Sequence, residues 1–404
     1  MSDGHASGAA MEPGTVISVE TRHSSGFHHK RPIVLAGGEG AVVWDAQGRR
    51  YIDCDTGHGL AILGHGHPAV TAAIKAQAEK LLTCGESFYS EPRARLYAEL
   101  AAAMPAGLDR FFLCNSGTEA VEGALKLARL TTGRSRVVAF RGGFHGRTFG
   151  SLSATWNPRY REPFAPLLDG FAHVPFNDAE AAAAAVTPEV GAVLVEPVQG
   201  EGGIHVATGG FLARLREACD STGALLVFDE VQTGVGRTGA FVAAQRFGVT
   251  PDVICLAKGL AGGVPIGAVA FGERVGEVPR GAHASTFGGN PLAAAAAAAT
   301  VAIVRKDRLA ERAAELGERF LGMMRQLAGE ARVVREVRGL GLMIAMDLKT
   351  RSARYLQALQ DRGVLALAAG PTVVRLLPPL VITWEQLEAV RDALALVLME
   401  DPPQ

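Results

Sequence analysis

The sequence predicts an α/β protein in which the larger part holds a mostly parallel, seven-stranded sheet and the C-terminal part forms a smaller α+β unit. From Leu100 to about Arg305, short apolar runs alternate with helical patterns, which is typical of parallel sheets. Several of these runs end directly in polar or glycine-rich residues, and open α/β sheets bind ligands at their strand ends. We therefore expect the functional site at one edge of this sheet.

The composition is that of a soluble globular protein with more than one folding unit. The chain has 404 residues, of which 48% are hydrophobic and 20% charged, and this length exceeds what one hydrophobic core usually serves. The net charge of −1 gives no electrostatic reason to expect nucleic acid or an anionic membrane as a partner. No apolar run reaches the roughly 20 residues of a membrane helix, and the N-terminus lacks the features of a signal peptide. We expect a cytoplasmic location.

Five cysteines are scattered along the chain without the spacing of metal ligands. Each lies in or near an apolar segment, which predicts buried free thiols in a reducing cytosol. They are Cys54, Cys84, Cys114, Cys219 and Cys255.

The N-terminal region begins with a small, polar tail, residues 1–14, that we expect to be disordered. Residues 41–54 predict two strands around an Asp-Ala-Gln-Gly turn. His65-Gly-His-Pro68 then opens a helix that runs to about Leu82, with Pro68 in its first turn. The two histidines have no nearby partners for a metal, so capping or packing roles are expected for them.

The central region carries the predicted sheet. Asn290 and Pro291 begin a long alanine-rich helix, since asparagine caps helices well and proline suits the first helical position. A change of composition at residues 305–308 marks the end of this region. The seven expected strands are 111–114, 136–140, 170–174, 191–195, 224–228, 253–256 and 267–271.

The C-terminal region has the pattern of an α+β unit without internal repeats. Its last helix starts at the capping box Thr383-x-x-Gln386 and runs to about Leu398. The other expected elements are strands at 333–337, 342–348, 364–367 and 372–377 and a helix at 352–360.

Lys258 and Asp229 are the strongest candidates for chemistry. Each follows a buried strand, so the two side chains are expected to converge on one pocket at the sheet edge. A lysine desolvated there becomes an amine nucleophile that can form a Schiff base with an aldehyde. A carboxylate beside it can hold a pyridinium nitrogen protonated, as pyridoxal phosphate (PLP) requires. The alternative is that Lys258 and Asp229 only cap secondary structure.

Two further motifs follow strands, one turning tightly into a helix and the other forming a glycine-rich loop. Ser116-Gly-Thr-Glu119 has the pattern of a capping box, and the N–H groups of Gly117 and Thr118 would suit a phosphate; a plain helix cap fits as well. In the loop 141–147, Phe144 could stack on an aromatic cofactor and Arg147 could bind a carboxylate. Here the alternative is a glycine loop with solvated arginines.

A third loop, 196–203, holds the two carboxylates of Glu196 and Glu201 after another buried strand. By itself this pattern favours two solvated loop carboxylates. Arg375 lies in an apolar run and needs a charged partner if it is buried.

These motifs, in this order, resemble the class III aminotransferases, which are PLP enzymes of fold type I. The resemblance extends from about residue 20 to 400 and implies a large PLP-binding domain at 66–305 and a small domain built from 15–65 and 306–404. Within the class, the chain is most similar to the acetylornithine aminotransferases, and especially to the branch that acts on lysine or ornithine attached to an amino-group carrier protein. The motifs are Ser116-Gly-Thr-Glu-Ala120, Gly143-Phe-His-Gly-Arg147, Glu196-Pro-Val-Gln-Gly-Glu201, Asp229-Glu-Val-Gln232, Leu256-Ala-Lys-Gly259, Ser285-Thr-Phe-Gly-Gly-Asn-Pro291 and Arg375-Leu-Leu-Pro-Pro379.

The resemblance also implies a role for each residue at the cofactor, pyridoxal 5'-phosphate. Lys258 would form the Schiff base and transfer the proton, and Asp229 would hold the ring nitrogen. The other implied contacts are Gln232 to the phenolic oxygen, Phe144 and Val231 on the two ring faces, Gly117 and Thr118 at the phosphate, and Ser116, His145 and Glu196 nearby. Thr286 would reach the cofactor phosphate bound in the other subunit, so a homodimer with shared sites is expected. No metal site is expected.

On the substrate side, Arg375 would bind the α-carboxylate of 2-oxoglutarate, and Glu201 would pair with it when the distal-amine donor is bound. Arg147 would take the other carboxylate. His28 and His58 stand where relatives tend to have tyrosines; they are either substrate contacts or structural residues. An acidic amino-group carrier protein would need a basic rim, for which Arg93, Arg95 and His29-Lys-Arg31 are candidates.

The expected reaction is transfer of a distal amine from an Nα-acylated ornithine or lysine to 2-oxoglutarate, which gives a semialdehyde and glutamate. An aminotransferase for 4-aminobutyrate, ornithine or another ω-amino acid is the alternative within PLP chemistry. A catalytically silent PLP-binding protein is the third hypothesis.

Overall fold

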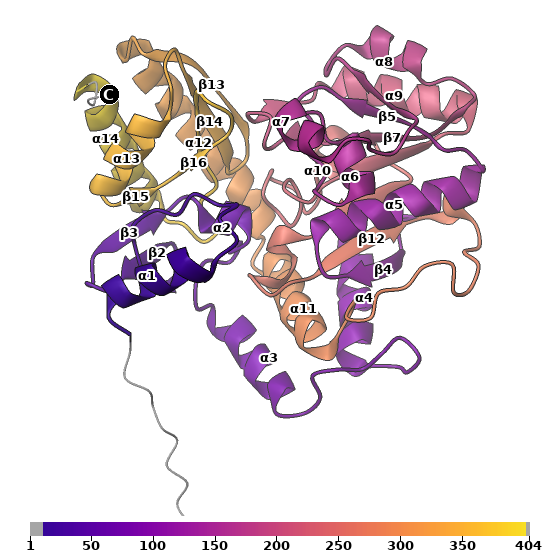
Figure 1. Cartoon of the computed structure of the whole chain (residues 1–404), viewed down its shortest axis with the longest axis horizontal. Helices are drawn as coiled ribbons and strands as arrows, with labels where there is room; N and C mark the ends of the chain where they lie inside the picture. The colour runs from indigo at the N-terminus through magenta and orange to yellow at the C-terminus, as the bar shows by residue number, and fades with distance from the viewer. Residues whose placement is uncertain (1–10, 401–404) are drawn as a thin grey trace, which may run out of the picture.

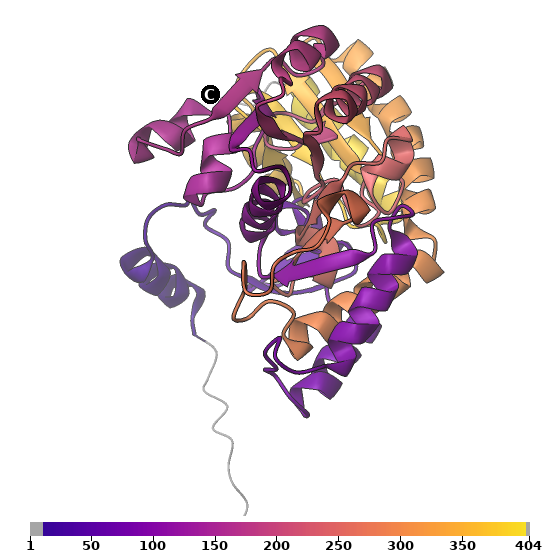
Figure 2. The ribbon, with the colours of Figure 1, turned by 90° about the vertical axis from the view of Figure 1, so that its right-hand side faces the viewer.

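The structure is a computed structural model that describes residues 11–400. Figure 1 shows a larger body around a central sheet and a smaller body in which the indigo N-terminal strands lie beside yellow C-terminal elements. In the turned view of Figure 2 the yellow elements lie behind the larger body. No helix within this described range is long and apolar enough to cross a membrane.

The larger body contains the predicted seven-stranded sheet, in the order β4-β12-β11-β10-β7-β5-β6. All seven predicted strands are present, with ends that differ by at most one residue. The sheet is mostly parallel as expected; β12 is antiparallel to both of its neighbours. The strands are β4 (Arg110–Cys114), β5 (Arg136–Phe140), β6 (Phe171–Val174), β7 (Val190–Val195), β10 (Leu225–Asp229), β11 (Val253–Leu256) and β12 (Gly267–Phe271).

Helices cover both faces of this sheet because successive strand residues point to opposite sides. Val227 packs in a cluster with residues of α5, whereas Phe228 packs in a second cluster with residues of α9. The helices of this body are α3 (Pro68–Ala78), α4 (Glu91–Ala103), α5 (Gly117–Thr132), α6 (Phe149–Ala154), α7 (Pro158–Arg161), α8 (Ala179–Ala185), α9 (Gly209–Thr222), α10 (Ala243–Phe247) and α11 (Pro291–Lys306), with short 3-10 turns η1 (Glu162–Phe164), η2 (Lys258–Ala261) and η3 (Glu273–Val275).

The smaller body joins the two ends of the chain. In its first sheet, order β1-β2-β3-β15, Ile52 of the N-terminal region pairs in parallel with Val364 of the C-terminal region. A second sheet has the order β13-β14-β17-β16. The elements are α1 (Pro13–His23), β1 (Leu35–Glu39), β2 (Val42–Asp45), β3 (Arg50–Asp53), α2 (Thr56–Gly59), α12 (Leu309–Glu330), β13 (Val334–Leu340), β14 (Met343–Leu348), α13 (Ala353–Asp361), β15 (Val364–Leu365), β16 (Leu367–Ala368), β17 (Val373–Leu376) and α14 (Trp384–Glu400).

Local chemistry explains where several predicted elements begin. Asn290 caps α11 by accepting a hydrogen bond from the N–H of Ala293. The capping box before α14 is formed: Thr383 and Gln386 each accept a hydrogen bond from the other's backbone N–H. Asp45 accepts from the N–H groups of Gln47 and Arg49 and so closes the predicted turn between β2 and β3.

Some expectations need correction. The helix from Pro68 ends at Ala78 rather than at about Leu82, and the expected strand 364–367 is divided into β15, which pairs with β3, and β16, which pairs with β17. The expected disordered tail falls mostly on residues outside the described range, but Pro13 and Gly14 already belong to α1. All five cysteines are free, but Cys84 is only half-buried.

Candidate active site

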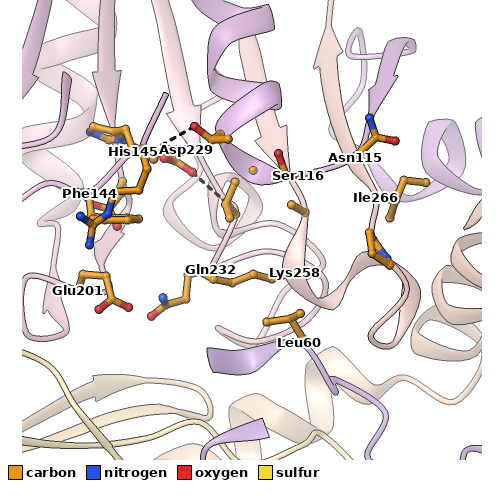
Figure 3. Close-up of a pocket in the computed structure, with 18 of the residues that line it drawn as sticks. Leu60, Asn115, Ser116, Phe144, His145, Glu201, Asp229, Gln232, Lys258 and Ile266 are labelled. Atoms are coloured by element: carbon orange, nitrogen blue, oxygen red, sulfur yellow. Dashed lines mark hydrogen bonds and ion pairs between the residues drawn. The ribbon is translucent and has the colours of Figure 1, made fainter. Parts of the chain in front are cut away.

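The polar residues that follow the central strands of the sheet line one cavity of about 390 Å³. β10 and β11 are parallel neighbours, with Asp229 opposite Cys255, so Asp229 and Lys258 leave the sheet at the same edge. Both line the cavity, as predicted from their positions after buried strands. Figure 3 shows Lys258 beside Gln232 in this cavity, with Asp229 and Ser116 nearby.

Lys258 has the surroundings of an amine nucleophile. It begins η2 with a backbone φ of 35°, which is rare for a residue other than glycine. Burial lowers the pKa of its amine, and the charge of Arg375 acts in the same direction; the charges of Glu201, Asp229 and Glu196 oppose this shift without cancelling it. The lowered pKa favours the uncharged amine, which is the form that attacks an aldehyde.

Asp229 is fixed through both carboxylate oxygens. Its Oδ2 lies 2.7 Å from Nδ1 of His145, and its Oδ1 accepts a hydrogen bond of 3.1 Å from the N–H of Val231. Burial by itself lowers the pKa of His145, but the hydrogen bond to Asp229 and the charges of Asp229 and Glu196 outweigh burial and raise that pKa. His145 therefore holds the Asp229 carboxylate in a fixed orientation.

The start of α5 provides an anion site beside Asp229. Gly117 and Thr118 are its first residues, and N–H groups there have no acceptor within the helix. A Cβ on Gly117 would lie 2.7 Å from Cγ1 of Val231, so this position has no room for a side chain. The predicted capping box is only half formed: Ser116 accepts from the N–H of Glu119, but the Glu119 carboxylate accepts from the N–H of Asn115 instead of Ser116.

Glu196 joins two loops of the cavity. Its carboxylate accepts hydrogen bonds from the N–H groups of Phe144, at 2.9 Å, and Gly200, at 3.1 Å. Burial raises the pKa of Glu196 to about 7, with the charge of Asp229 adding to the effect and His145 and the two N–H donors opposing it. Phe144, held in this way, lines the cavity, and Val231 lines it too.

Arg375 is fully buried and has the charged partner that its apolar surroundings required. Its Nη1 donates to Oε1 of Glu201 at 2.6 Å and to Oε1 of Gln232 at 3.3 Å. Its Nε and Nη2 have no partner among the described residues, which is unusual for a buried guanidinium. Burial tends to raise the pKa of Glu201, but the charge and hydrogen bond of Arg375 lower it. The unpaired Nε and Nη2 donors of Arg375 suit a carboxylate ligand.

Arg147 lies at the edge of the cavity. It is exposed, and its guanidinium stacks on the ring of Tyr160, 3.7 Å from the ring centre, and more loosely on Phe144 at 5.5 Å. Stacking restricts the side chain while its N–H donors stay available, as carboxylate binding requires.

Four predicted residues do not line this cavity in the described chain. Thr286, His28 and His58 are exposed, whereas Arg375 is buried and is joined to the cavity through Glu201 and Gln232, which do line it. His58 is nevertheless close enough for its charge to lower the pKa of Glu201. Conversely, Leu60, Asn115, Ala257 and the segment 263–266 line the cavity and were not predicted. For Asn115 the available signal was its position directly before the Ser116 motif.

The residues of the cavity fit PLP. A desolvated lysine, a fixed carboxylate, an aromatic face and a helix N-terminus without room for a Cβ match the aldehyde, pyridine nitrogen, ring and phosphate of this cofactor. Together with the α/β fold, they define the site of a PLP-dependent enzyme of fold type I.

Comparisons with known proteins identify the family. The family described as aminotransferase class-III matches residues 25–398, and the chain belongs to it. The chain is 45% identical over 401 residues to a [LysW]-aminoadipate semialdehyde transaminase of Deinococcus radiodurans, covering 98% of this chain and 93% of the relative. It is 49% identical over 367 residues to an acetylornithine aminotransferase of Methanopyrus kandleri, covering 90% and 94%. The crystal structure of the ornithine aminotransferase of Toxoplasma gondii ME49 has a TM-score of 0.92 at 33% identity, covering 97% and 96%. The protein is thus a PLP-dependent aminotransferase.

Proposed function

We propose that this enzyme transfers the distal amine of an Nα-acylated ornithine or lysine to 2-oxoglutarate, which gives a semialdehyde and glutamate. The observation that carries the proposal is the ion pair of Arg375 with Glu201, which lines the same cavity as Lys258. The reaction needs a site that accepts a dicarboxylate in one half and a primary amine on an alkyl chain in the other. The names of the relatives, acetylornithine aminotransferase and [LysW]-aminoadipate semialdehyde transaminase, agree with this substrate class.

The residues around the cofactor divide the work of the reaction. When bound, PLP supplies the electron sink that acidifies the carbon bearing the amine. Lys258, with its lowered pKa, holds the cofactor between turnovers and moves the proton at that carbon. Asp229 keeps the ring nitrogen charged, with His145 as its support. Phe144 and Val231 would hold the ring between them.

Glu201 and Arg375 would alternate between two arrangements. With the amine donor bound, Glu201 keeps its ion pair and neutralises the buried guanidinium. With 2-oxoglutarate bound, its α-carboxylate replaces Glu201 and also occupies Nε and Nη2, which lack partners in the described chain. Arg147 would bind the far carboxylate in both halves.

Replacing Glu201 tests this alternation. In Glu201→Gln, Arg375 stays open in both half-reactions, so glutamate or the α-amino end of the donor should react more readily relative to the distal amine. Single-turnover rates with acetylornithine and glutamate measure the ratio. A ratio equal to that of the wild type would contradict the proposed alternation of Glu201 and 2-oxoglutarate at Arg375.

Lys258 is tested directly by Lys258→Ala. This variant should lose turnover and the near-visible absorbance of the lysine-bound cofactor, because the amine is gone. If both persisted, the protein would be using another nucleophile; if the wild type itself bound PLP without turnover, it would be a silent binding protein.

The choice of donor separates the proposal from its alternatives. Measuring kcat/KM for Nα-acetylornithine, Nα-acetyllysine, free ornithine and 4-aminobutyrate, each with 2-oxoglutarate as acceptor, identifies the preferred donor. We expect the Nα-acylated donors to be best, since Arg147 can bind their carboxylate while an acylated nitrogen carries no repelling charge. Free ornithine or 4-aminobutyrate as the best donor would replace the proposed substrate but leave the aminotransferase intact.

A carrier-bound donor is the finer form of this proposal, and the rim it would use differs from the one expected. Of the earlier candidates, Arg93 is buried against backbone carbonyls, Arg95 pairs with Glu91, Lys30 pairs with Glu20, and Arg31 bonds the carbonyl of Ala366. Four other arginines lie in the loop before α6 and in the helix α7, and none of them has an ion pair within residues 11–400. They are Arg141, Arg147, Arg159 and Arg161.

An acidic carrier protein would dock on these arginines through charge complementarity. Arg159→Glu with Arg161→Glu should lower kcat/KM for a carrier conjugate of lysine or ornithine by about tenfold or more, mostly through slower association. The same variant should leave acetylornithine unaffected, and Arg95→Glu serves as the control. An equal loss with both donors would contradict docking.

We also propose that the enzyme is a homodimer with shared sites, as the position of Thr286 suggests. Thr286 is exposed in a segment with Phe287, which is 65% exposed. Phe88 and Tyr89 form a second exposed aromatic group. Exposed aromatic side chains of this kind are typical of protein–protein contacts.

A further inference from the structure

Glu201 lies on a short, irregular loop whose backbone is held from two sides. The loop, residues 200–204, connects the two-residue strands β8 (Val198–Gln199) and β9 (His205–Val206), which pair antiparallel. Ile204 in this loop has a φ of 61°, a conformation that is strained for a β-branched residue. Such strain persists only where the surroundings impose it, so the contacts of this loop matter for the position of Glu201.

On the side of the larger body, two glycines of the loop have no room for a side chain. A Cβ on Gly200 would lie 2.3 Å from Oε1 of Gln232, and a Cβ on Gly202 would lie 2.4 Å from the carbonyl oxygen of Gly142. The N–H of Gly200 also donates to Glu196. The backbone on both sides of Glu201 is therefore packed closely against residues of the larger body.

On the opposite side, the smaller body holds the loop through Arg338. Arg338 belongs to β13, and its Nε donates a 2.8 Å hydrogen bond to the carbonyl oxygen of Gly203. Its Nη1 lies 2.6 Å from Glu336 and 3.5 Å from Asp347, so the guanidinium is itself fixed. The side chain of Arg338 is only 11% exposed. Beside it, Ile204 is fully buried in a cluster with residues of β14 and β17.

The same sheet carries the partner of Glu201. β13 pairs with β14, and Ala345 of β14 lies opposite Arg375 of β17. Arg338 and Arg375 thus stand on one sheet, and each contacts the Glu201 loop, one at its backbone and the other at its carboxylate. The sheet therefore fixes Arg338 and Arg375 relative to each other. Through these two contacts it also fixes the Glu201 loop relative to the Arg375 guanidinium.

We propose that Arg338 is a positioning residue for substrate specificity: it fixes the backbone of the Glu201 loop so that Glu201 returns to Arg375 after each dicarboxylate leaves. The inference rests on the proposed alternation of Glu201 and 2-oxoglutarate at Arg375. With the backbone held, the exchange needs only rotation of the Glu201 side chain. Without Arg338, the ion pair loses its preorganised geometry and competes less well with an incoming carboxylate.

The test uses Arg338→Met in the holoenzyme, with Arg335→Met as the matched control. Arg335 also contacts Asp347, at 3.3 Å, so each variant leaves Asp347 one arginine, but Arg335 makes no contact with the loop among the described residues. Glutarate, a non-reacting dicarboxylate, reports on access to Arg375 by calorimetry. In Arg338→Met its Kd should fall about fivefold, the effect of one lost hydrogen bond. The ratio of single-turnover rates should shift about as much toward glutamate.

Equal glutarate affinity in the Arg338→Met and Arg335→Met proteins would overturn the inference. Arg338→Lys, which keeps one donor in reach of Gly203, should give an intermediate Kd and decides the matter if Arg338→Met does not fold. In a Glu201→Gln background, Arg338→Met should change the ratio less than twofold, because the residue acts through Glu201. A further fivefold change there would show an independent effect and contradict the inference. If Glu201→Gln alone leaves the ratio unchanged, the proposed alternation itself fails.

Discussion

Asp229 shows how single side chains prepare this site before a substrate arrives. Its two oxygens bind His145 and the N–H of Val231, so the carboxylate cannot rotate away from the cavity. His145 is buried, and its raised pKa reflects the negative charge that it faces. A charge held in a fixed place in a buried site stabilises a transition state without reorganisation at the moment of reaction.

Asp229→Asn should therefore retain the cofactor but lose most of the activity. The amide keeps the shape of the side chain, but it carries no charge to hold the ring nitrogen protonated. We expect kcat to fall by about a hundredfold or more, the usual size of such an electrostatic loss. Absorbance measures the bound cofactor and steady-state kinetics measure kcat. Turnover close to that of the wild type would show that Asp229 is not the partner of the ring nitrogen.

Glu230, the neighbour of Asp229, predicts a pH effect on stability instead of activity. It is fully buried and accepts hydrogen bonds from the N–H groups of Ala243 and Ala244 and from Thr233. Burial raises its pKa to about 7. A raised carboxyl pKa means that the folded protein binds the proton more tightly than the unfolded chain does. This stabilising effect is complete at pH values below the ordinary value of 4.5 and is lost as pH rises through about 7.

Glu230→Gln should therefore flatten the pH dependence of Tm between pH 5 and pH 8. The amide does not titrate, so the decrease in Tm toward high pH should be smaller than in the wild type, whatever the level of Tm itself. Differential scanning calorimetry at several pH values gives both slopes. Identical slopes would mean that Glu230 does not titrate in this range.

At the scale of elements, the helix α5 has two functions. Its buried face packs on the sheet, and its first residues, Gly117 and Thr118, line the cavity. Gly117→Ala should disturb the second function, because the new methyl group would meet Val231 at 2.7 Å. We expect faster loss of PLP on dialysis. Gly322→Ala, in a helix position with no atom within 4 Å, is the control and should retain PLP normally.

The elements that could be predicted from the sequence are those with local signals. Buried strands ending in polar motifs gave all seven strands of the large sheet, and Asn290 and Thr383 marked two helix starts. α12 was not predicted although it has 22 residues. The residue before it, Arg308, has a φ of 51° and makes no side-chain cap, so the sequence has no start signal for this helix. β8 and β9 have two residues each, too few for any periodicity.

The site was predictable where chemistry follows a strand and unpredictable where partners are distant in sequence. Position after a strand placed Asp229 and Lys258 in one cavity. The hydrogen bond between His145 and Asp229 spans 84 residues, and nothing local in the sequence announces it. Neighbouring residues in the sequence also do not show whether an arginine is exposed. Arg93 was expected on a basic rim, but the fold buries it against carbonyl groups.

For the whole molecule, the shared site of the proposed dimer gives a complementation test. Lys258→Ala and Thr286→Ala subunits, mixed and allowed to exchange, should form dimers in which one site contains both wild-type residues. Cofactor retention and activity should exceed those of either variant alone. A mixture of Lys258→Ala and Asp229→Asn subunits is the control, since both residues line the cavity of the same chain and no site is restored. Equal behaviour of the two mixtures would contradict a shared site.

The pairing of β3 with β15 also has a consequence for biosynthesis. Ile52 and Val364 are about 310 residues apart, so the ribosome releases the first strands long before their neighbour exists. Until then, the edge of β3 is an open template for pairing with other nascent chains. We therefore expect the N-terminal strands to need protection from such pairing until the last tenth of the chain is made.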